Sequence, residues 1–329
     1  MTADREAVAA VDCGTNSTRL LIVDAHGDTL TRRMEITRLG QGVAATGRLA
    51  PAAVDRTIDV LLGYRRLMDD LGVRRVRITA TSAARDAGNR EDFFSAAEAA
   101  VGSAPELLTG DEEGRLSFTG ATADLNPEMG PFLVADVGGG STELVAGPSS
   151  DTAADRFSVA GVRSLDVGCV RLTETYLPSD PPGHDEIEAA RSAVAALVRT
   201  ALEEIPALAR PATLIGLAGT VSALTRLHQG LDVYDRDRVH HTWLGKDAVD
   251  RLLAGLAAET VEQRRRHRGM ETERADVIVG GAIVLAELMA LVGAERCLVS
   301  ESDILDGLAM SLLPVPGFQP PGPQPPLPF

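Results

Sequence analysis

The pattern D-x-G-x-x-S occurs twice in the sequence, as Asp12-Cys13-Gly14-Thr15-Asn16-Ser17 and as Asp136-Val137-Gly138-Gly139-Gly140-Ser141. Each copy follows one short apolar run and precedes another, which is typical of a turn between two β-strands. Glycines let backbone N–H groups approach an anion, a serine hydroxyl adds a donor, and a strand-end carboxylate can hold Mg²⁺ beside the same phosphate. One such turn could be an ordinary hairpin, but two in the same context predict a duplicated phosphate-binding fold.

The elements around each copy follow one order. In the first half we expect three strands ending near Ile36, a helix from Pro51, a strand at 73–80, a helix at 89–101 capped by Asn89, and a helix at 111–123. In the second half we expect strands at 132–135, 142–146, 157–162, 214–217 and 296–299, with helices between them, one at 272–291, and a last helix at 302–313. Two βββαβα halves predict an α/β protein with a duplicated actin/hexokinase/Hsp70-like (ribonuclease H-like) fold, in which two domains enclose an interdomain cleft.

This order of elements also gives the predicted domain boundaries. Residues 1–125 form the first actin-like domain, which a C-terminal helix at 300–313 completes, and residues 126–299 form the second. Residues 314–329 contain eight of the eighteen prolines. Because proline cannot donate a backbone hydrogen bond, we expect this segment to be a Pro-rich disordered tail.

The charge of the chain excludes several classes of partner. It has 32 Lys plus Arg and 47 Asp plus Glu, a formal net charge of −15, so we expect no nucleic acid and no membrane among its partners. The sequence has no apolar run of about 18 residues, no signal-peptide pattern at its start, and three widely spaced cysteines, which predicts a cytoplasmic protein without a zinc or disulfide framework. A polyanionic ligand would therefore need local arginines or a metal ion.

Three further features carry candidate chemistry. A strand–glycine–helix turn at residues 217–222 places the amides of Gly219 and Thr220 at a helix N-terminus, which suits an anion. The run Arg264-Arg265-Arg266-His267-Arg268 could guide a polyanion, although a solvated helix end explains it as well. His240 and His241 are adjacent, and neighbouring side chains on a helix or strand point different ways, so we expect no metal site there.

Several segments together resemble the exopolyphosphatase / guanosine pentaphosphate phosphohydrolase (Ppx/GppA) family. In chain order they are Asp12-x-Gly14-Thr15-Asn16-Ser17-x-Arg19-Leu20, Thr81-Ser82-Ala83-Ala84-Arg85-Asp86-Ala87-x-Asn89, Gly110-x-Glu112-Glu113-Gly114-Arg115-Leu116, Asp136-Val137-Gly138-Gly139-Gly140-Ser141-Thr142-Glu143-Leu144, Asp166-Val167-Gly168-Cys169-Val170-Arg171-Leu172-Thr173-Glu174, Glu273-Arg274-Ala275-Asp276 and Asp306-Gly307-Leu308. The chain is similar to the short, two-domain members, because nothing after Leu313 could form the further helical domain of the long ones.

The resemblance implies the role of general base for Glu113. The chemistry agrees in kind, because hydrolysis of a phosphoanhydride needs a carboxylate that orients and deprotonates water. Ligands for Mg²⁺ (or Mn²⁺) are expected from Asp136 and Glu143, with Asp12 as the symmetric counterpart. The expected phosphate-binding residues are Gly14, Thr15, Asn16, Ser17, Arg19, Ser82, Arg85, Gly138, Gly139, Gly140, Ser141, Gly219, Thr220 and Arg274, of which Arg274 rests on the resemblance alone.

These observations predict a Mg²⁺-dependent phosphoanhydride hydrolase. It would release terminal orthophosphate from inorganic polyphosphate, from guanosine pentaphosphate, or from both. The resemblance also implies a part in the stringent response and, from the short relatives, a homodimer. Two alternatives stay open: an ATP-dependent kinase of the same superfamily, and a non-catalytic or weakly catalytic regulator that binds guanosine penta- or tetraphosphate.

Overall fold

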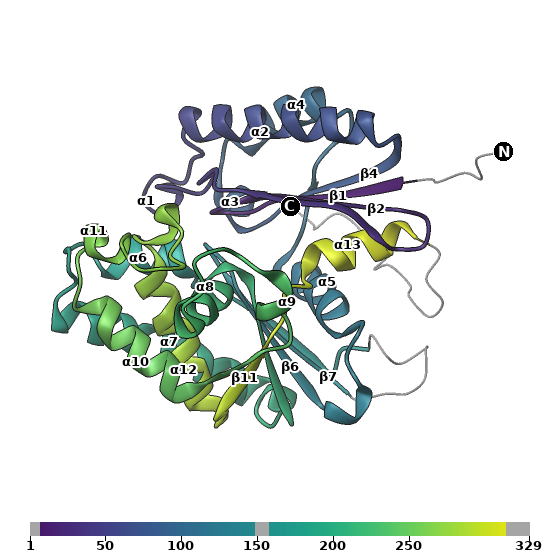
Figure 1. The fold of residues 1–329 in the computed structure, drawn as a ribbon. Coiled ribbons are helices and arrows are strands. Elements are labelled where there is room, and N and C mark those ends of the chain that lie inside the picture. The colour runs from purple at the N-terminus through teal and green to yellow at the C-terminus, as the bar shows by residue number, and fades with distance from the viewer. Residues whose placement is uncertain (1–6, 149–157, 314–329) are drawn as a thin grey trace.

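Two mixed β-sheets form the frame of the molecule in the computed structural model, which describes residues 7–148 and 158–313 (Figure 1). The described strands of the first sheet lie in the order β3-β2-β1-β4-β5 and are β1 (Ala7–Cys13), β2 (Thr18–Val23), β3 (Thr29–Glu35), β4 (Val73–Ala80) and β5 (Glu106–Leu107). Those of the second sheet lie in the order β10-β11-β9-β6-β7-β8 and are β6 (Phe132–Val137), β7 (Thr142–Gly147), β8 (Gly161–Leu165), β9 (Thr213–Leu217), β10 (Trp243–Gly245) and β11 (Arg296–Val299).

The two sheets repeat one arrangement. β1, β2 and β3 form an antiparallel meander with β4 parallel to β1, and β6, β7 and β8 form a second meander with β9 parallel to β6. In both first turns a glycine amide donates to the carbonyl oxygen of the serine that ends the motif, Gly14 to Ser17 at 3.0 Å and Gly138 to Ser141 at 3.1 Å. The predicted duplication, and with it the α/β, actin-like class of fold, is confirmed.

The outer face of the first sheet is covered by α2 (Pro51–Asp70) and α4 (Arg90–Val101), which lie along the top of Figure 1. α2 begins at Pro51, where the missing N–H leaves no helical hydrogen bond unmade. Asn89 precedes α4, but its side chain does not cap the helix. It exchanges hydrogen bonds of 2.8 and 3.1 Å with the backbone of Leu49 instead, so the predicted cap is wrong.

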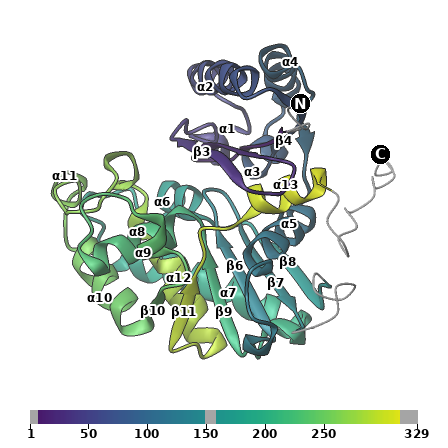
Figure 2. The ribbon, with the colours of Figure 1, turned by 45° about the vertical axis from the view of Figure 1, so that its right-hand side comes forward.

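The other face of the first sheet is covered by the last described helix, α13 (Ile304–Leu312). Leu305 and Leu308 of this helix share one apolar cluster with Val8 of β1 and Leu21 of β2. Figures 1 and 2 show α13 lying between the first sheet and α5 (Gly110–Thr122). The end of the described chain therefore packs on the sheet with which the chain begins.

Helix α5 links α13 to the second sheet. A Cβ added at Gly120 would lie 2.9 Å from the carbonyl carbon of Asp303, and one at Gly307 would lie 2.8 Å from that of Leu116, so the two helices touch through glycines. Phe118 of α5 belongs to the apolar cluster on the second sheet. The predicted first domain, residues 1–125, thus includes a helix with divided core contacts: Leu116 lies in the cluster of the first sheet and α13, and Phe118 in that of the second sheet.

The opposite face of the second sheet packs against a layer of helices, which are α6 (Cys169–Tyr176), α7 (His184–Glu204), α8 (Ala218–Gln229), α10 (Lys246–Ala257) and α12 (Ile278–Val292). α12 is buried over most of its length, and its apolar residues reach the sheet at Leu133 and Leu144. Among the described helices, none is both long and apolar enough to cross a membrane.

Short elements account for most differences from the predicted pattern. They are α1 (Val43–Thr46), α3 (Ser82–Asp86), α9 (Arg236–Val239), α11 (Val261–Arg264) and 3-10 turns at Pro127–Met129, Pro206–Leu208 and Thr272–Arg274. The helix predicted at 272–291 is divided into the last of these turns and α12, and the strand predicted from residue 157 begins at Gly161. Residue 157 and the predicted tail at 314–329 lie outside the described residues.

Candidate active site

The molecule has a first lobe, built on the sheet of β1–β5, and a second lobe, built on the sheet of β6–β11. The two D-x-G-x-x-S turns meet where these lobes touch. A Cβ added at Gly139 would lie 2.9 Å from Cβ of Thr15, and one at Gly140 would lie 2.8 Å from Oγ1 of Thr15 and would collide with Oγ of Ser82. Only glycine allows the second turn to approach the first turn this closely. The amides of Gly14 and Gly138 donate inside their own turns, so neither is free to donate to an anion.

The first turn carries an acidic residue that is neutralised. Asp12, which is buried, is the cross-strand partner of Arg19, and the Arg19 guanidinium lies 2.7 Å from Oδ2 of Asp12 and 2.5 Å from Oδ2 of Asp303. Burial raises the pKa of Asp12, while Arg19 opposes the shift. Arg19, which the sequence predicts to bind phosphate, is therefore paired with two carboxylates of the protein. Oδ1 of Asp12 is buried without a hydrogen-bond partner.

The second turn carries two acidic residues that face each other. Asp136 pairs across the β6–β7 ladder with Glu143, and both are buried. Ser117 donates to Oδ2 of Asp136 at 2.7 Å, and Ser164 donates to Oε1 of Glu143 at 2.8 Å. Burial raises the pKa of Asp136 to about 6, and burial together with the charges of Glu113 and Asp136 raises the pKa of Glu143 well above its ordinary range.

This acidic pair fits a divalent cation. Like charges directly opposite each other in a ladder destabilise a sheet, and a cation between them would remove the repulsion. The unpartnered Oδ1 of Asp12 also suits an oxygen-seeking ion, and Asp12 is close enough to Asp136 to raise its pKa. Carboxylate oxygens are the ligands that Mg²⁺ and Mn²⁺ prefer.

The neighbours Glu112 and Glu113 have different tasks at the start of α5. The Glu112 carboxylate accepts the Thr109 amide at 2.8 Å, and Oγ1 of Thr109 accepts the Glu112 amide at 3.2 Å, which is a capping box. Glu113 instead points to the lobe junction, where its Oε2 accepts from Arg85 at 2.7 Å and its side chain is 13% exposed. Burial raises the pKa of Glu113 to about 7, against the effect of Arg85 and with a contribution from Asp12 and Asp136.

Arg85 connects Glu113 to the second turn. It lies in α3 and donates to the Leu108 carbonyl oxygen at 3.0 Å, and its Nη2 lies 3.5 Å from Oγ of Ser141. The predicted residues Ser82, Arg85, Glu113 and Ser141 are thereby brought to one place.

The third predicted loop has a different environment. The Arg274 guanidinium lies so close to Gly219 that any side chain there would collide with it, and Nε of Arg274 donates to Oε2 of Glu271 at 2.9 Å. Thr220 is buried, and its hydroxyl lies where a Cβ on Gly281 would fall. The structure places Gly219, Thr220 and Arg274 against Glu271 and Gly281, where Thr220 packs in the core.

The basic run at 264–268 does not form a free patch. Arg264 is buried and donates from Nε to the Leu256 carbonyl oxygen at 2.7 Å. The next four side chains pair with acids: Arg265 and Arg266 with Glu262, His267 with Glu259 and Arg268 with Asp232. Neither predicted role, guidance of a polyanion or a solvated helix end, applies to Arg264, whose buried side chain binds the backbone of Leu256.

The adjacent histidines converge, contrary to our expectation that they point apart. His241 has a positive φ of 59°, the two rings stack with centroids 3.7 Å apart, and both Nε2 atoms face Asp124, at 3.2 Å and 3.6 Å. These atoms lie close enough to hold a metal ion. However, Nδ1 of His240 accepts the Glu301 amide, so the neutral ring carries its proton on Nε2 and donates it to Asp124. His240 thus joins Asp124 to the Glu301 backbone by hydrogen bonds, whereas Nε2 of His241 is buried without a hydrogen-bond partner.

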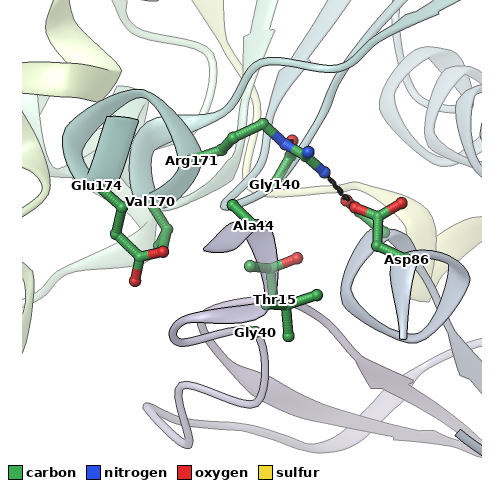
Figure 3. A pocket seen from close by; sticks show the side chains of 10 residues that line it. Thr15, Gly40, Ala44, Asp86, Gly140, Val170, Arg171 and Glu174 are labelled. Carbon is green, nitrogen blue, oxygen red and sulfur yellow. Dashed lines mark hydrogen bonds and ion pairs between the residues drawn. The ribbon is translucent and has the colours of Figure 1, made fainter. Parts of the chain in front are cut away.

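A pocket opens beside the junction of the two turns (Figure 3). Its lining residues are Thr15, Gly40, Val43, Ala44, Ser82, Asp86, Gly140, Val170, Arg171 and Glu174. Asp86, Arg171 and Glu174 were not among the predicted site residues, although they fall in segments that carry the family resemblance. Ser117 and Ser164 hold Asp136 and Glu143 in position, and Asp303 pairs with Arg19. These three residues gave no signal in the sequence because each acts on a partner distant along the chain.

The fold and the site together define a protein of the actin-like class with an acidic centre between two lobes. The profile described as the Ppx/GppA phosphatase family matches residues 21–315, and the chain belongs to this family.

Named relatives agree with this assignment. Exopolyphosphatase 2 of Mycobacterium tuberculosis is 45% identical over 323 residues, which cover 93% of this chain and 98% of the relative. Among solved structures, an exopolyphosphatase-like protein has a TM-score of 0.87 with 34% identity and covers 93% of this chain and 98% of its own. The Ppx/GppA family member of Aquifex aeolicus has a TM-score of 0.77 with 31% identity and covers 94% and 98%.

Proposed function

We propose that this protein is an exopolyphosphatase, which hydrolyses the terminal phosphoanhydride bond of inorganic polyphosphate and releases orthophosphate. The observation that carries the proposal is the Glu113 carboxylate at the lobe junction, with a pKa raised to about 7 and with Arg85 bound to it. A base whose pKa lies near the working pH is ionised to a useful extent and still accepts a proton readily. The 45% identity to an exopolyphosphatase supports the same activity.

The proposal includes a divalent cation, Mg²⁺ or Mn²⁺. Asp136 and Glu143 would hold it through carboxylate oxygens, with Asp12 near them. When bound, such an ion supplies positive charge to phosphate oxygens.

The residues of this chain would divide the remaining work. Glu113 would orient a water molecule and accept its proton as the water attacks the terminal phosphorus in line with the leaving oxygen. The Arg85 guanidinium lies within reach of both Glu113 and Ser141. A phosphate bound beside Ser141 would therefore accept hydrogen bonds from the same planar guanidinium that binds Glu113. The hydroxyls of Ser82 and Ser141 would donate to the same phosphate.

Guanosine pentaphosphate also ends in a phosphoanhydride and is therefore the second substrate to be compared. A kinase would instead transfer the phosphate of ATP to an added acceptor and release ADP, and a regulator would bind guanosine tetraphosphate without releasing phosphate. A homodimer and a cytoplasmic location are further parts of the proposal, for light scattering and cell fractionation to test.

The test is release of orthophosphate from short polyphosphate, long polyphosphate and guanosine pentaphosphate, side by side with Mg²⁺. Glu113→Gln keeps the shape of the side chain but cannot accept the proton, so its turnover should fall by about 10²–10⁴-fold.

Glu112→Gln is the matched control, because glutamine at this position also closes a capping box. It should keep near wild-type turnover and melting temperature. Equal losses in the two variants would contradict the role of Glu113, and no release from any of the three substrates by the wild-type protein would contradict the proposed function.

A further inference from the structure

A guanidinium of the second lobe lies between the second turn and α3 and is held by a carboxylate of the first lobe. Arg171 of α6 donates from Nε to the carbonyl oxygen of Gly140 at 2.8 Å, and its Nη2 lies 3.5 Å from Oγ of Ser82. The same Nη2 pairs with Asp86 at the end of α3, as Figure 3 shows. The side chains of Arg171 and Asp86 are 24% and 36% exposed, so the ion pair is open to a ligand.

This ion pair borders the pocket beside the turns. The charged residues that line the pocket are Arg171, Asp86 and Glu174. Glu174 accepts the Gly42 amide of the first lobe at 3.1 Å and so forms a second contact between α6 and that lobe. With two carboxylates and one guanidinium, the lining carries a surplus of negative charge, and a polyanion entering here is repelled for as long as Asp86 neutralises Arg171.

We propose that Arg171 is a substrate-binding residue that exchanges partners. In the free protein it holds Asp86, and in the complex it holds a phosphate further along the polyphosphate chain than the terminal one. The identity of this substrate rests on the proposed function. A guanidinium binds carboxylate and phosphate oxygens with the same forked geometry, so the exchange can proceed while Nε stays on Gly140.

Asp86 then acts as a built-in competitor. A ligand must carry enough negative charge to displace it, which favours linked phosphates over single orthophosphate. Because Asp86 can return to Arg171 after hydrolysis, the same ion pair assists release of the shortened product.

The experiment measures binding of bis(methylene)triphosphate, a triphosphate analogue that cannot be hydrolysed at its bridging carbons, by calorimetry with Mg²⁺ present. The variants are Asp86→Asn, Arg171→Gln and the double variant, with melting curves to verify folding. Asp69→Asn is the matched control, because it removes the same charge from an ion pair with Arg65 that lies within α2.

We expect Asp86→Asn to bind the analogue about 3- to 10-fold more tightly than Asp69→Asn does, and Arg171→Gln to bind it at least about 10-fold more weakly than the wild type. The gain from Asp86→Asn should disappear when Arg171 is already replaced. Unchanged or weaker binding by Asp86→Asn, or the same gain without Arg171, would overturn the exchange.

Binding and turnover separate this inference from the proposed function. A wild-type protein that binds the analogue but releases no phosphate from polyphosphate contradicts the exopolyphosphatase proposal, while the exchange is still judged by the ratios of affinities. A wild-type protein that does not bind the analogue overturns the exchange.

Discussion

The acidic residues of the two duplicated turns differ in what stands opposite each of them. Asp12 faces Arg19 across the first ladder, whereas Asp136 faces Glu143 across the second. The first carboxylate is therefore neutralised by a guanidinium directly opposite it, whereas Asp136 and Glu143 are held by the hydroxyls of Ser117 and Ser164. The two turns therefore differ in electrostatic character, and this difference is why we propose the second turn as the cation site.

A thermal shift tests this assignment at single residues. A ligand that binds only the folded state raises the melting temperature by mass action, so Mg²⁺ should stabilise the wild-type protein. The shift should vanish in Asp136→Asn and Glu143→Gln, and it should persist in Asp69→Asn. If Asp136→Asn kept the full Mg²⁺-induced shift in melting temperature, the cation would have to bind at another place.

The raised pKa of Glu113 predicts the pH dependence of hydrolysis. In the proposed mechanism the ionised carboxylate acts as the base, so kcat/KM should fall as the pH drops through about 7 and level off above it. Initial rates between pH 5.5 and 9, with conditions that keep the cation bound, measure this profile. A rate that stays constant from pH 6 to 8 would contradict Glu113 as the titrating base.

The same shift has a consequence for stability. Because the folded pKa of about 7 lies above the ordinary value of 4.5, the folded state binds this proton more tightly than the unfolded state. The stabilising contribution is complete below about pH 4.5 and is lost as the pH rises through 7. The difference in free energy of unfolding between Glu113→Gln and the wild type should therefore move in favour of the variant from pH 5 to pH 8, by at most about 3 kcal/mol, in urea titrations.

Secondary structure elements were predictable where the residue pattern of a segment is long enough to identify a helix or a strand. The strand predicted at 73–80 coincides with β4, because its sequence has β-branched residues and clear ends. The helices α1, α3 and α9 have four or five residues each, too few for a 3.6-residue period to register. Their positions depend on contacts with distant parts of the chain.

The candidate site was predictable to a similar degree. The two turns could be found because their glycines, serine and carboxylate are neighbours in the sequence. Glu113 was predicted from the family resemblance, and the structure separates it from Glu112, which closes a capping box with Thr109. The pair of Arg171 and Asp86 spans 85 positions, and no spacing rule connects residues so far apart. Only the fold brings them together.

The crossing of α5 and α13 gives a prediction about elements. Gly307→Ala would place a methyl group 2.8 Å from the Leu116 carbonyl carbon, and because both atoms belong to helices fixed by their cores, the loss should be about 1–3 kcal/mol. Gly63→Ala in α2, where nothing lies within 4 Å, should stabilise by about 0.5–1 kcal/mol. Urea titrations of both variants compare the two, and a stable Gly307→Ala protein would contradict close helix contact.

At the scale of the whole molecule, the residues around the candidate site have a surplus of negative charge, as the whole chain has. Its arginines are engaged by acids: Arg19 by Asp12 and Asp303, Arg85 by Glu113, and Arg171 by Asp86. With Asp136 and Glu143 added, six carboxyl groups meet three guanidinium groups, and the raised pKa values of Glu113, Asp136 and Glu143 reduce this surplus of negative charge. A polyanion therefore meets no positive funnel before the cation binds, and long-range repulsion by a chain of −15 is not offset locally.

This surplus predicts the direction of the salt effect on hydrolysis. At constant free Mg²⁺, raising NaCl should increase kcat/KM for long polyphosphate, because repulsion beyond the Debye length of ~8 Å at physiological salt is screened while the partly buried contacts are not. A variant with Asp69→Asn, Glu91→Gln and Glu262→Gln removes three exposed acids, whose side chains are 57%, 80% and 64% exposed, and changes the net charge from −15 to −15 + 3 = −12. It should exceed the wild type at low salt and match it at high salt. A kcat/KM that falls steadily with salt in both proteins would mean that the bound cation and freed arginines attract the substrate more strongly than the whole chain repels it.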